Sequence, residues 1–181
     1  PSSAASDVYK RQSVFRELMV DHVIAGGQTM NPSIDAIASA IRKVNARNVF
    51  VLPNNGNIIM AAQQAAGIAS CNVIVLPTKT IPQGIAAAMA FNGSVDVQAN
   101  EKAMTAAIGE VVSGAVTYAV RSTKFRGEDI SQGDIIGMMD NELCCVGTAV
   151  DAVTADLLRR MIEKRGEPDA AVTIFYGESV D

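Results

Sequence analysis

The chain has 181 residues, of which 49% are hydrophobic, 19% charged and 4% aromatic, and its formal net charge is −4. A chain of this length can bury a normal core as one large domain or as two smaller lobes. The acidic balance, the lack of a block of basic residues and the small number of aromatic rings argue against nucleic acid and anionic membranes as partners.

The cysteines and the apolar runs bear on the compartment. Three cysteines, two of them adjacent, do not make an even disulfide framework, which is typical of a reducing environment. No apolar run reaches the roughly 18 residues that span a bilayer, and no secretory signal opens the chain. We therefore expect a cytoplasmic protein without membrane insertion.

Residues 1–12 are rich in serine and alanine without an apolar period, which predicts a disordered or non-native leader. Residues 14–19 are then expected to end a helix, and Val23–Ile24 to form a short strand. A helix in an α/β chain usually follows a strand, so we expect a truncation at this end. The chain also stops soon after its last predicted strand, which indicates a truncation at the other end.

A polar stretch from Gly26 to Ser33 separates that short strand from an amphipathic helix. Its glycines permit positive φ, Asn31 or Ser33 can cap the helix, and Pro32 suits the first helical turn. A helix N-terminus beside a polar loop favours an anion or a carboxylate. The alternative is a strand-to-helix turn with good capping. The candidate binding residues here are Gly26, Gly27, Gln28, Thr29, Asn31 and Ser33.

Two similar units follow, each with an apolar run that ends in proline, a polar loop and an Ala-rich helix, at 58–66 or 82–91. The continuous apolar runs predict strands at 49–52 and 73–76 that are buried on both faces, as parallel neighbours in a sheet. Loops after parallel strands share the edge where open α/β sheets bind ligands, although every α/β sheet has loops there. This edge adds the candidates Asn54, Asn55, Asn57, Thr78, Lys79, Thr80 and Gln83.

The character of the sequence changes near residue 111. Alternating apolar residues predict a strand at 116–120, and turn signals separate further short strands at 135–139 and 143–146. The result is an antiparallel meander, whose hairpin at Asp140–Asn141 is expected to project from the body. Thr148 is expected to cap a helix that ends at Gly166, and residues 172–176 to form a last strand. We therefore predict an α/β lobe at 13–110 and a mixed α+β lobe at 111–181.

Motifs that carry chemistry are missing from the sequence. It has no Gly-rich phosphate-binding loop, no H-E-x-x-H and no C-x-x-C. The single histidine, His22, precedes an apolar strand, so no catalytic role is expected for it. Lys79 and Arg121 can hold an anion or can simply be solvated, and both are kept as candidates. We expect no catalytic residue and no metal site in this chain.

Four motifs together resemble the C-terminal region of the bacterial fatty acid kinase A subunit, which is dihydroxyacetone-kinase-like. They are Gly26–Ser33, Leu52–Asn55 with Asn57–Ile59, Pro77–Gly84 and Thr117–Arg121, and the resemblance runs from about Val14 to the end. It implies a doubly wound fold of the DegV or dihydroxyacetone kinase type. It also implies docking of a DegV-like, fatty-acid-binding B subunit, whose fatty acid is phosphorylated for phospholipid synthesis.

The resemblance implies ATP and magnesium only for a kinase domain that this chain lacks, and it leaves open homo-oligomers of the full-length protein. Dihydroxyacetone kinase holds its substrate through a histidine that His22 does not match in position, so that role is not carried over. The alternatives are a substrate subunit of a dihydroxyacetone kinase-like enzyme and a DegV-like lipid-binding module. We expect the isolated chain to bind a partner and not to catalyse a reaction.

Overall fold

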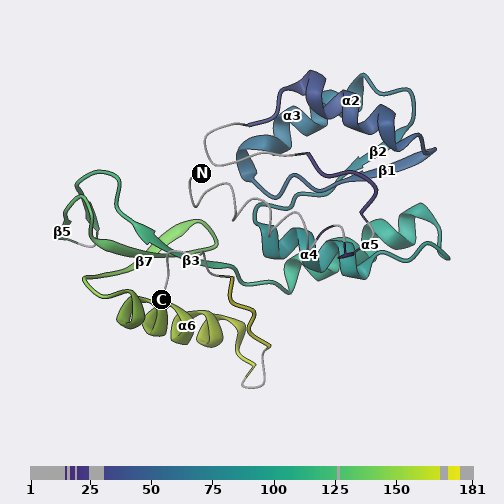
Figure 1. Ribbon diagram of the computed structural model, residues 1–181. Helices are drawn as coiled ribbons and strands as arrows, with labels where there is room; N and C mark the ends of the chain where they lie inside the picture. The colour runs from purple at the N-terminus through teal and green to yellow at the C-terminus, as the bar shows by residue number, and fades with distance from the viewer. Residues whose placement is uncertain are drawn as a thin grey trace. The chain divides into compact units, whose positions relative to one another are not determined.

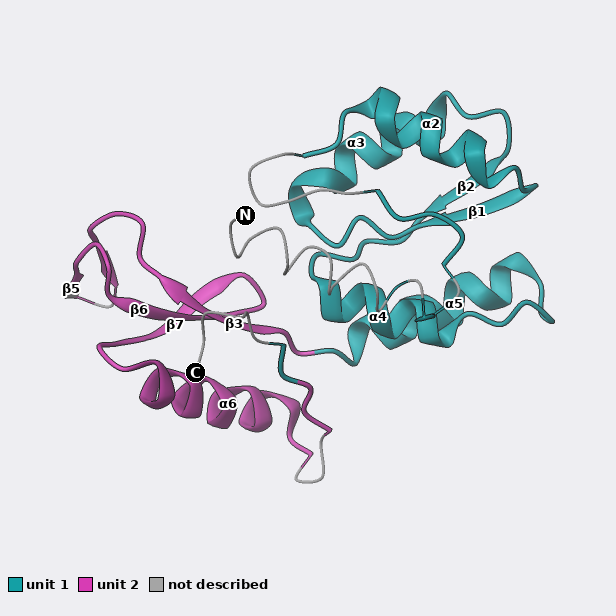
Figure 2. Cartoon of the chain, viewed as in Figure 1, with its two compact units in different colours: residues 1–111, 174–181 teal, residues 112–173 magenta. Residues whose placement is uncertain are grey.

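The computed structural model describes residues 15, 17–18, 20–24, 31–125, 127–167 and 171–175, without the side chain of Glu128. The chain divides into two compact units (Figure 2). Unit 1 comprises Pro1–Val111 with Ile174–Asp181, and unit 2 comprises Val112–Thr173. Among the described residues, no helix combines the length and the apolar character needed to cross a membrane.

Unit 1 is built around two short parallel strands. The elements run α2 (Ile34–Val44), β1 (Asn48–Val51), α3 (Gly56–Gly67), β2 (Asn72–Val75), α4 (Ile81–Ala90) and α5 (Val97–Gly109). β1 and β2 pair in parallel, with Val49 opposite Val73, so the predicted parallel pairing is confirmed. Figure 1 shows α2 and α3 on one side of this pair and α4 and α5 on the other.

The alternation of side chains along the strands explains the two helical layers. Because successive residues of a strand face opposite sides, a strand between two layers needs apolar residues throughout. One core packs the valines of both strands against α2 and α3, with Ile37, Ile41, Ala62 and Ala65 at its centre. The other packs Phe50, Ile74 and Leu76 against α4 and α5, with Ala87, Met104 and Ile108.

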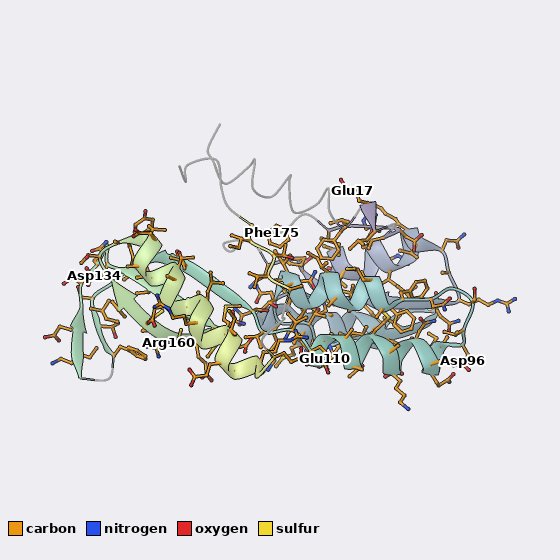
Figure 3. All side chains as sticks on the ribbon, turned by 90° about the horizontal axis from the view of Figure 1, so that it is seen from below. Glu17, Asp96, Glu110, Asp134, Arg160 and Phe175 are labelled. Atoms are coloured by element: carbon orange, nitrogen blue, oxygen red, sulfur yellow. The ribbon has the colours of Figure 1, made fainter. Side chains whose placement is uncertain are left out.

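Side-chain caps define where the helices of unit 1 begin. Ser33 caps α2, since its hydroxyl accepts a hydrogen bond from the Ala36 amide at 3.1 Å. Pro32 therefore precedes the cap, so the expectation that it lies in the first helical turn was wrong. Asp96 caps α5, and Glu110 lies at the other end of that helix (Figure 3). The expected strand at Val23–Ile24 was also wrong, because these residues belong to no strand within the part of the chain that the structure describes.

Unit 2 places one helix on an antiparallel sheet. Its elements are β3 (Gly114–Tyr118), β4 (Thr123–Phe125), β5 (Glu128–Ile130), β6 (Ile135–Met139), β7 (Glu142–Gly147) and α6 (Val150–Arg165). The sheet has the order β3-β6-β7, and β4 and β5 form a separate hairpin between β3 and β6. The antiparallel pairing agrees with the prediction. α6 covers one face of the sheet through a core of Ile135, Cys144, Cys145, Val153 and Leu157.

The turn between β6 and β7 does not project, contrary to the expectation. Asp140 and Asn141 both have positive φ, 50° and 71°, as a tight hairpin turn requires. The Asp140 carboxylate accepts a hydrogen bond from the Ser113 amide at 2.9 Å and pairs with Lys164 of α6 at 2.8 Å. These two contacts hold the turn to Ser113, directly before β3, and to α6. The hydrogen bond between Lys164 and Asp140 raises the pKa of the Lys164 ammonium.

Two further expectations in this part of the chain were wrong. Thr148 does not cap α6, because the cap residue is Ala149, which makes no side-chain capping bond. Residues 172–175 form no strand, although their sequence is rich in strand-forming residues. Val172, Ile174 and Phe175 are at least half exposed. A strand requires a partner ladder, and local propensity alone does not supply one.

Candidate functional site

The candidate site is the edge where the two parallel strands end. Because β1 and β2 are parallel and in register, the loops that follow them start side by side (Figure 1). The Asn54 amide donates a hydrogen bond to the Thr78 hydroxyl at 2.9 Å, which ties the two loops together. Thr78 is completely buried, whereas its contact with Asn54 is only partly buried.

Asn54 also lies against the first turn of α4. Its backbone has φ +58°, a left-handed conformation that asparagine tolerates better than most residues. A Cβ at Gly84 would overlap the Asn54 carboxamide, so only glycine fits this position without a shift. The Oδ1 atom of Asn54 is buried and has no hydrogen-bond partner among the described residues. Such an atom is costly in a folded protein, which makes this loop contact unusual.

Several of the predicted polar side chains are used by the fold itself. Asn55 caps α3 by accepting from the Asn57 amide at 2.9 Å, and Thr80 caps α4 by accepting from the Gln83 amide at 3.4 Å. The Gln83 side chain in turn accepts from the Lys79 amide at 2.8 Å. These bonds occupy backbone amides at the starts of the helices, which a bound anion would otherwise use as hydrogen-bond donors. Helix capping and the bond that supports it therefore use three of the seven candidate side chains at this edge, those of Asn55, Thr80 and Gln83.

The Lys79 ammonium is the charged group that this edge presents to solvent. Lys79 is exposed, and no ion pair engages it within the part of the chain that the structure describes. The N-terminal ends of α3 and α4 follow the same two strands, and such ends carry a partial positive charge. The edge is therefore locally positive and complements a carboxylate or a phosphate.

The remaining candidates are placed differently. Gly26, Gly27, Gln28 and Thr29 lie outside the described residues. Asn31 is exposed ahead of α2, and Ser33 serves as the cap of that helix. Arg121 is exposed and lies in unit 2. His22 is exposed as well.

A shallow surface depression lies at the opposite edge of the strand pair. It has a volume of about 450 Å³ and is lined by residues before β1 and by residues before and at the start of β2: Asn45, Ala46, Arg47, Ser70, Cys71 and Asn72. Within the described ranges, no group of three or more histidine, cysteine or acidic residues has the arrangement of a metal site.

Two residues that the sequence analysis did not single out shape unit 1. Gly84 allows Asn54 to approach α4, and a single glycine within an Ala-rich helix is the signal that pointed to such a contact. Asn100 is 3% exposed in α5 and holds the preceding loop, accepting from the Asn92 amide at 2.7 Å and donating to the Asn92 carbonyl at 2.8 Å. Polar residues are ordinary in an amphipathic helix, so the sequence did not indicate that Asn100 makes this buried contact.

Comparison with known proteins shows the family. Residues 4–181 match the model of the C-terminal region of proteins like the A subunit of fatty acid kinase, and the chain belongs to that family. Protein YloV of Bacillus subtilis (strain 168) is 47% identical over 167 residues, which make up 91% of this chain and 29% of YloV. An uncharacterised protein of Staphylococcus aureus (strain USA300) is 35% identical over 170 residues, 93% of this chain and 30% of that protein. The chain therefore spans less than a third of the length of these relatives.

Proposed function

We propose that this chain forms the partner-docking region of an A-type fatty acid kinase protein and that it does not catalyse phosphorylation by itself. Family membership supports a role related to fatty acid kinase. The docking role is supported by the edge at the ends of β1 and β2, where the 2.9 Å bond between Asn54 and Thr78 fixes two loops beside an exposed lysine. The positive edge, with its two loops joined by this hydrogen bond, is the observation that carries the proposal.

In this proposal the edge orients the partner and takes no part in bond making. A DegV-like B subunit carries the fatty acid, and Lys79 attracts an acidic group of that partner or the carboxylate of its acyl chain. ATP and magnesium bind elsewhere in the longer protein. Phosphoryl transfer depends mainly on positioning and on charge stabilisation, so a docking region can raise the rate without chemistry of its own.

The finer fold assignment belongs to the same proposal. A parallel strand pair between two helical layers, followed by a separate antiparallel unit, is compatible with the DegV and dihydroxyacetone kinase type of fold. A cytoplasmic location and a partnership with the B subunit agree with this assignment. Homo-oligomers of the longer protein are compatible with it too.

Calorimetric titration of the B subunit loaded with fatty acid, and separately of ATP, into the chain tests the proposal. We expect binding of the loaded B subunit and no binding of ATP. Lys79→Glu should weaken B-subunit binding by about 1 kcal/mol, roughly fivefold, and more at low salt. Lys102→Glu is the matched control, because Lys102 is an exposed lysine of α5. Tight ATP binding without a response to the B subunit, in a chain that melts cooperatively, would overturn the proposal.

A further inference from the structure

Two adjacent cysteines of β7 are buried together beneath α6, although neighbouring residues of a strand normally face opposite sides. The register explains this arrangement. Gly137 of β6 pairs with Cys145, and the next residue, Met138, pairs with Leu143, so Cys144 is the extra residue of a bulge. A bulge turns the strand locally and re-aims its side chains. Both thiols are consequently 6% to 7% exposed and lie in the same core.

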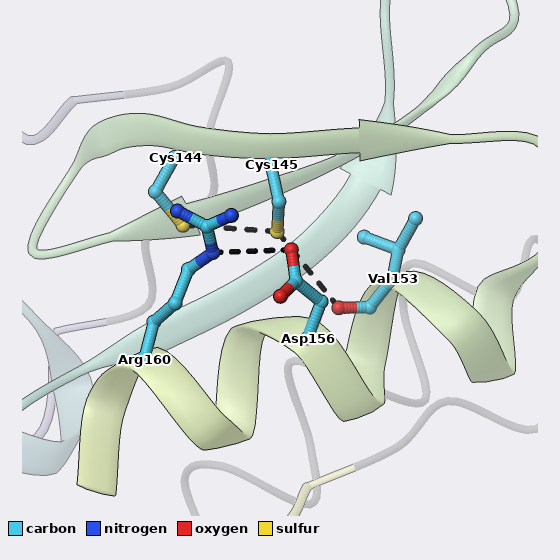
Figure 4. Close-up of polar contacts among 5 residues, drawn as sticks. All are labelled: Cys144, Cys145, Val153, Asp156 and Arg160. Carbon is cyan, nitrogen blue, oxygen red and sulfur yellow. Dashed lines mark hydrogen bonds and ion pairs between the residues drawn. The ribbon is translucent and has the colours of Figure 1, made fainter. Parts of the chain in front are cut away.

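The sulfur atoms lie close to each other and to the helix. The Sγ atoms of Cys144 and Cys145 are 3.7 Å apart, and Cys145 Sγ lies 3.8 Å from the Val153 carbonyl oxygen (Figure 4). A Cβ at Gly137 would overlap Cys145 Sγ, so the glycine provides the space that this sulfur occupies. Bulge and glycine together bring the two thiols into one contact.

We propose that Cys144 and Cys145 form a redox-active vicinal dithiol, which a hydroperoxide oxidises to a disulfide between the two neighbours. One thiolate attacks the peroxide oxygen, which gives a sulfenic acid and releases an alcohol, or water from hydrogen peroxide. The second thiol then attacks the sulfenic sulfur, forms the S–S bond and releases water. Two thiol hydrogens and one peroxide are consumed, and the reverse reaction needs an external dithiol such as dithiothreitol.

The geometry predicts that this bond is reversible. The Cα atoms of adjacent residues are about 3.8 Å apart, below the roughly 4.4–6.8 Å of ordinary disulfides, so a bond between them is strained and easily reduced. To form it, the sulfur atoms must approach from 3.7 Å to about 2.05 Å. Cys145 then withdraws from Val153 and from the space beside Gly137. Oxidation should therefore loosen the packing of α6 on its sheet.

The surroundings set the rate of the reaction. Burial, and the hydrogen bond with Cys144, raise the pKa of the Cys145 thiol to about 11, which leaves little thiolate at neutral pH. The Arg160 guanidinium, held by Asp156 at 3.0 Å, lies beside the thiols and partly counters this effect (Figure 4). The pair should thus respond to sustained oxidant and not to a brief pulse.

The test uses the Cys71→Ser chain, in which Cys144 and Cys145 are the remaining thiols. After prolonged incubation with hydrogen peroxide under native conditions, the chain is denatured, alkylated and analysed by mass spectrometry. We expect a monomer that has lost two hydrogens, a peptide with both cysteines unalkylated, and full recovery with dithiothreitol. The oxidised chain should also melt at a lower temperature.

Two comparisons make the test decisive. Cys144→Ser in the same background should lose the two-hydrogen product and give only oxygen addition at Cys145. In guanidinium the thiols should oxidise faster, because burial no longer raises the pKa of Cys145, but the disulfide between the two neighbours should make up a smaller share of the oxidised chains, because the bulge that aligns the sulfurs is lost. An equal share in both conditions, cross-linked dimers, or thiols that remain reduced after native incubation with peroxide would each overturn the proposal. The wild-type chain serves as a second sample if Cys71→Ser does not melt cooperatively.

Discussion

Replacing Thr78 with valine tests whether the hydrogen bond between the two loops of unit 1 stabilises the candidate edge. The substitution keeps the shape of the buried side chain and removes the acceptor of the Asn54 amide. A donor left without a partner costs about 1–3 kcal/mol, and because this contact is only partly buried we expect about 1–2 kcal/mol. With a typical urea m-value of about 2 kcal/mol/M, the unfolding midpoint should fall by roughly 0.5–1 M.

The assay combines urea unfolding, followed by circular dichroism, with amide hydrogen exchange. Exchange of the Asn54 amide assigns the loss to this contact, because this amide should exchange faster in Thr78→Val than in the wild type. Thr117→Val is the control, since Thr117 is exposed on β3 and should change stability by less than about 0.5 kcal/mol. An unchanged midpoint with unchanged exchange at Asn54 would refute the reasoning.

Three further predictions concern single side chains. Gly84→Ala should cost about 1–3 kcal/mol, because the new methyl overlaps the Asn54 carboxamide, whereas Gly93→Ala has room and should leave the urea midpoint unchanged. Ser33→Ala removes the cap of α2 and should cost about 1 kcal/mol in thermal melts, and an unaltered melting temperature would contradict the capping role. The pKa of the Cys145 thiol is about 11 in the folded chain, against an ordinary 9.0 when unfolded. The contribution of this thiol to the unfolding free energy should therefore decline as the pH rises between these values. Denaturation of wild type and Cys145→Ala across this range checks the sign, because the decline should be missing in the variant.

Part of the candidate site could be predicted from the chain alone. Two apolar runs that each end in proline predicted parallel strands, and parallel strands necessarily bring the loops after them to one edge. The structure joins Asn54 to Thr78 there. A role of this edge in binding stays a prediction. The sequence could not predict which of its polar residues cap helices and which remain available to a ligand, because capping and ligand binding use the same residue types.

Two of the expectations that failed share one physical cause. The turn at Asp140 had the polar sequence of a projecting hairpin, yet the Ser113 amide, 27 residues earlier in the chain, holds it in place. Residues 172–175 had the composition of a strand but pair with no other strand among the described residues. In both cases the outcome depends on a distant partner, which no local pattern contains.

The amino-acid sequence by itself determined the parallel pair of unit 1 and the antiparallel character of unit 2, and it limited the cap of α2 to Asn31 or Ser33. Each follows from a periodicity or a residue type within a few positions, where sterics and burial leave few alternatives. Only the tertiary structure decided that Gly84 accommodates Asn54 and that a bulge opposite Gly137 brings Cys144 and Cys145 into contact. Such contacts depend on which surfaces pack against each other and on the register of the strands. Both are properties of the assembled fold, so a local stretch of sequence does not contain them.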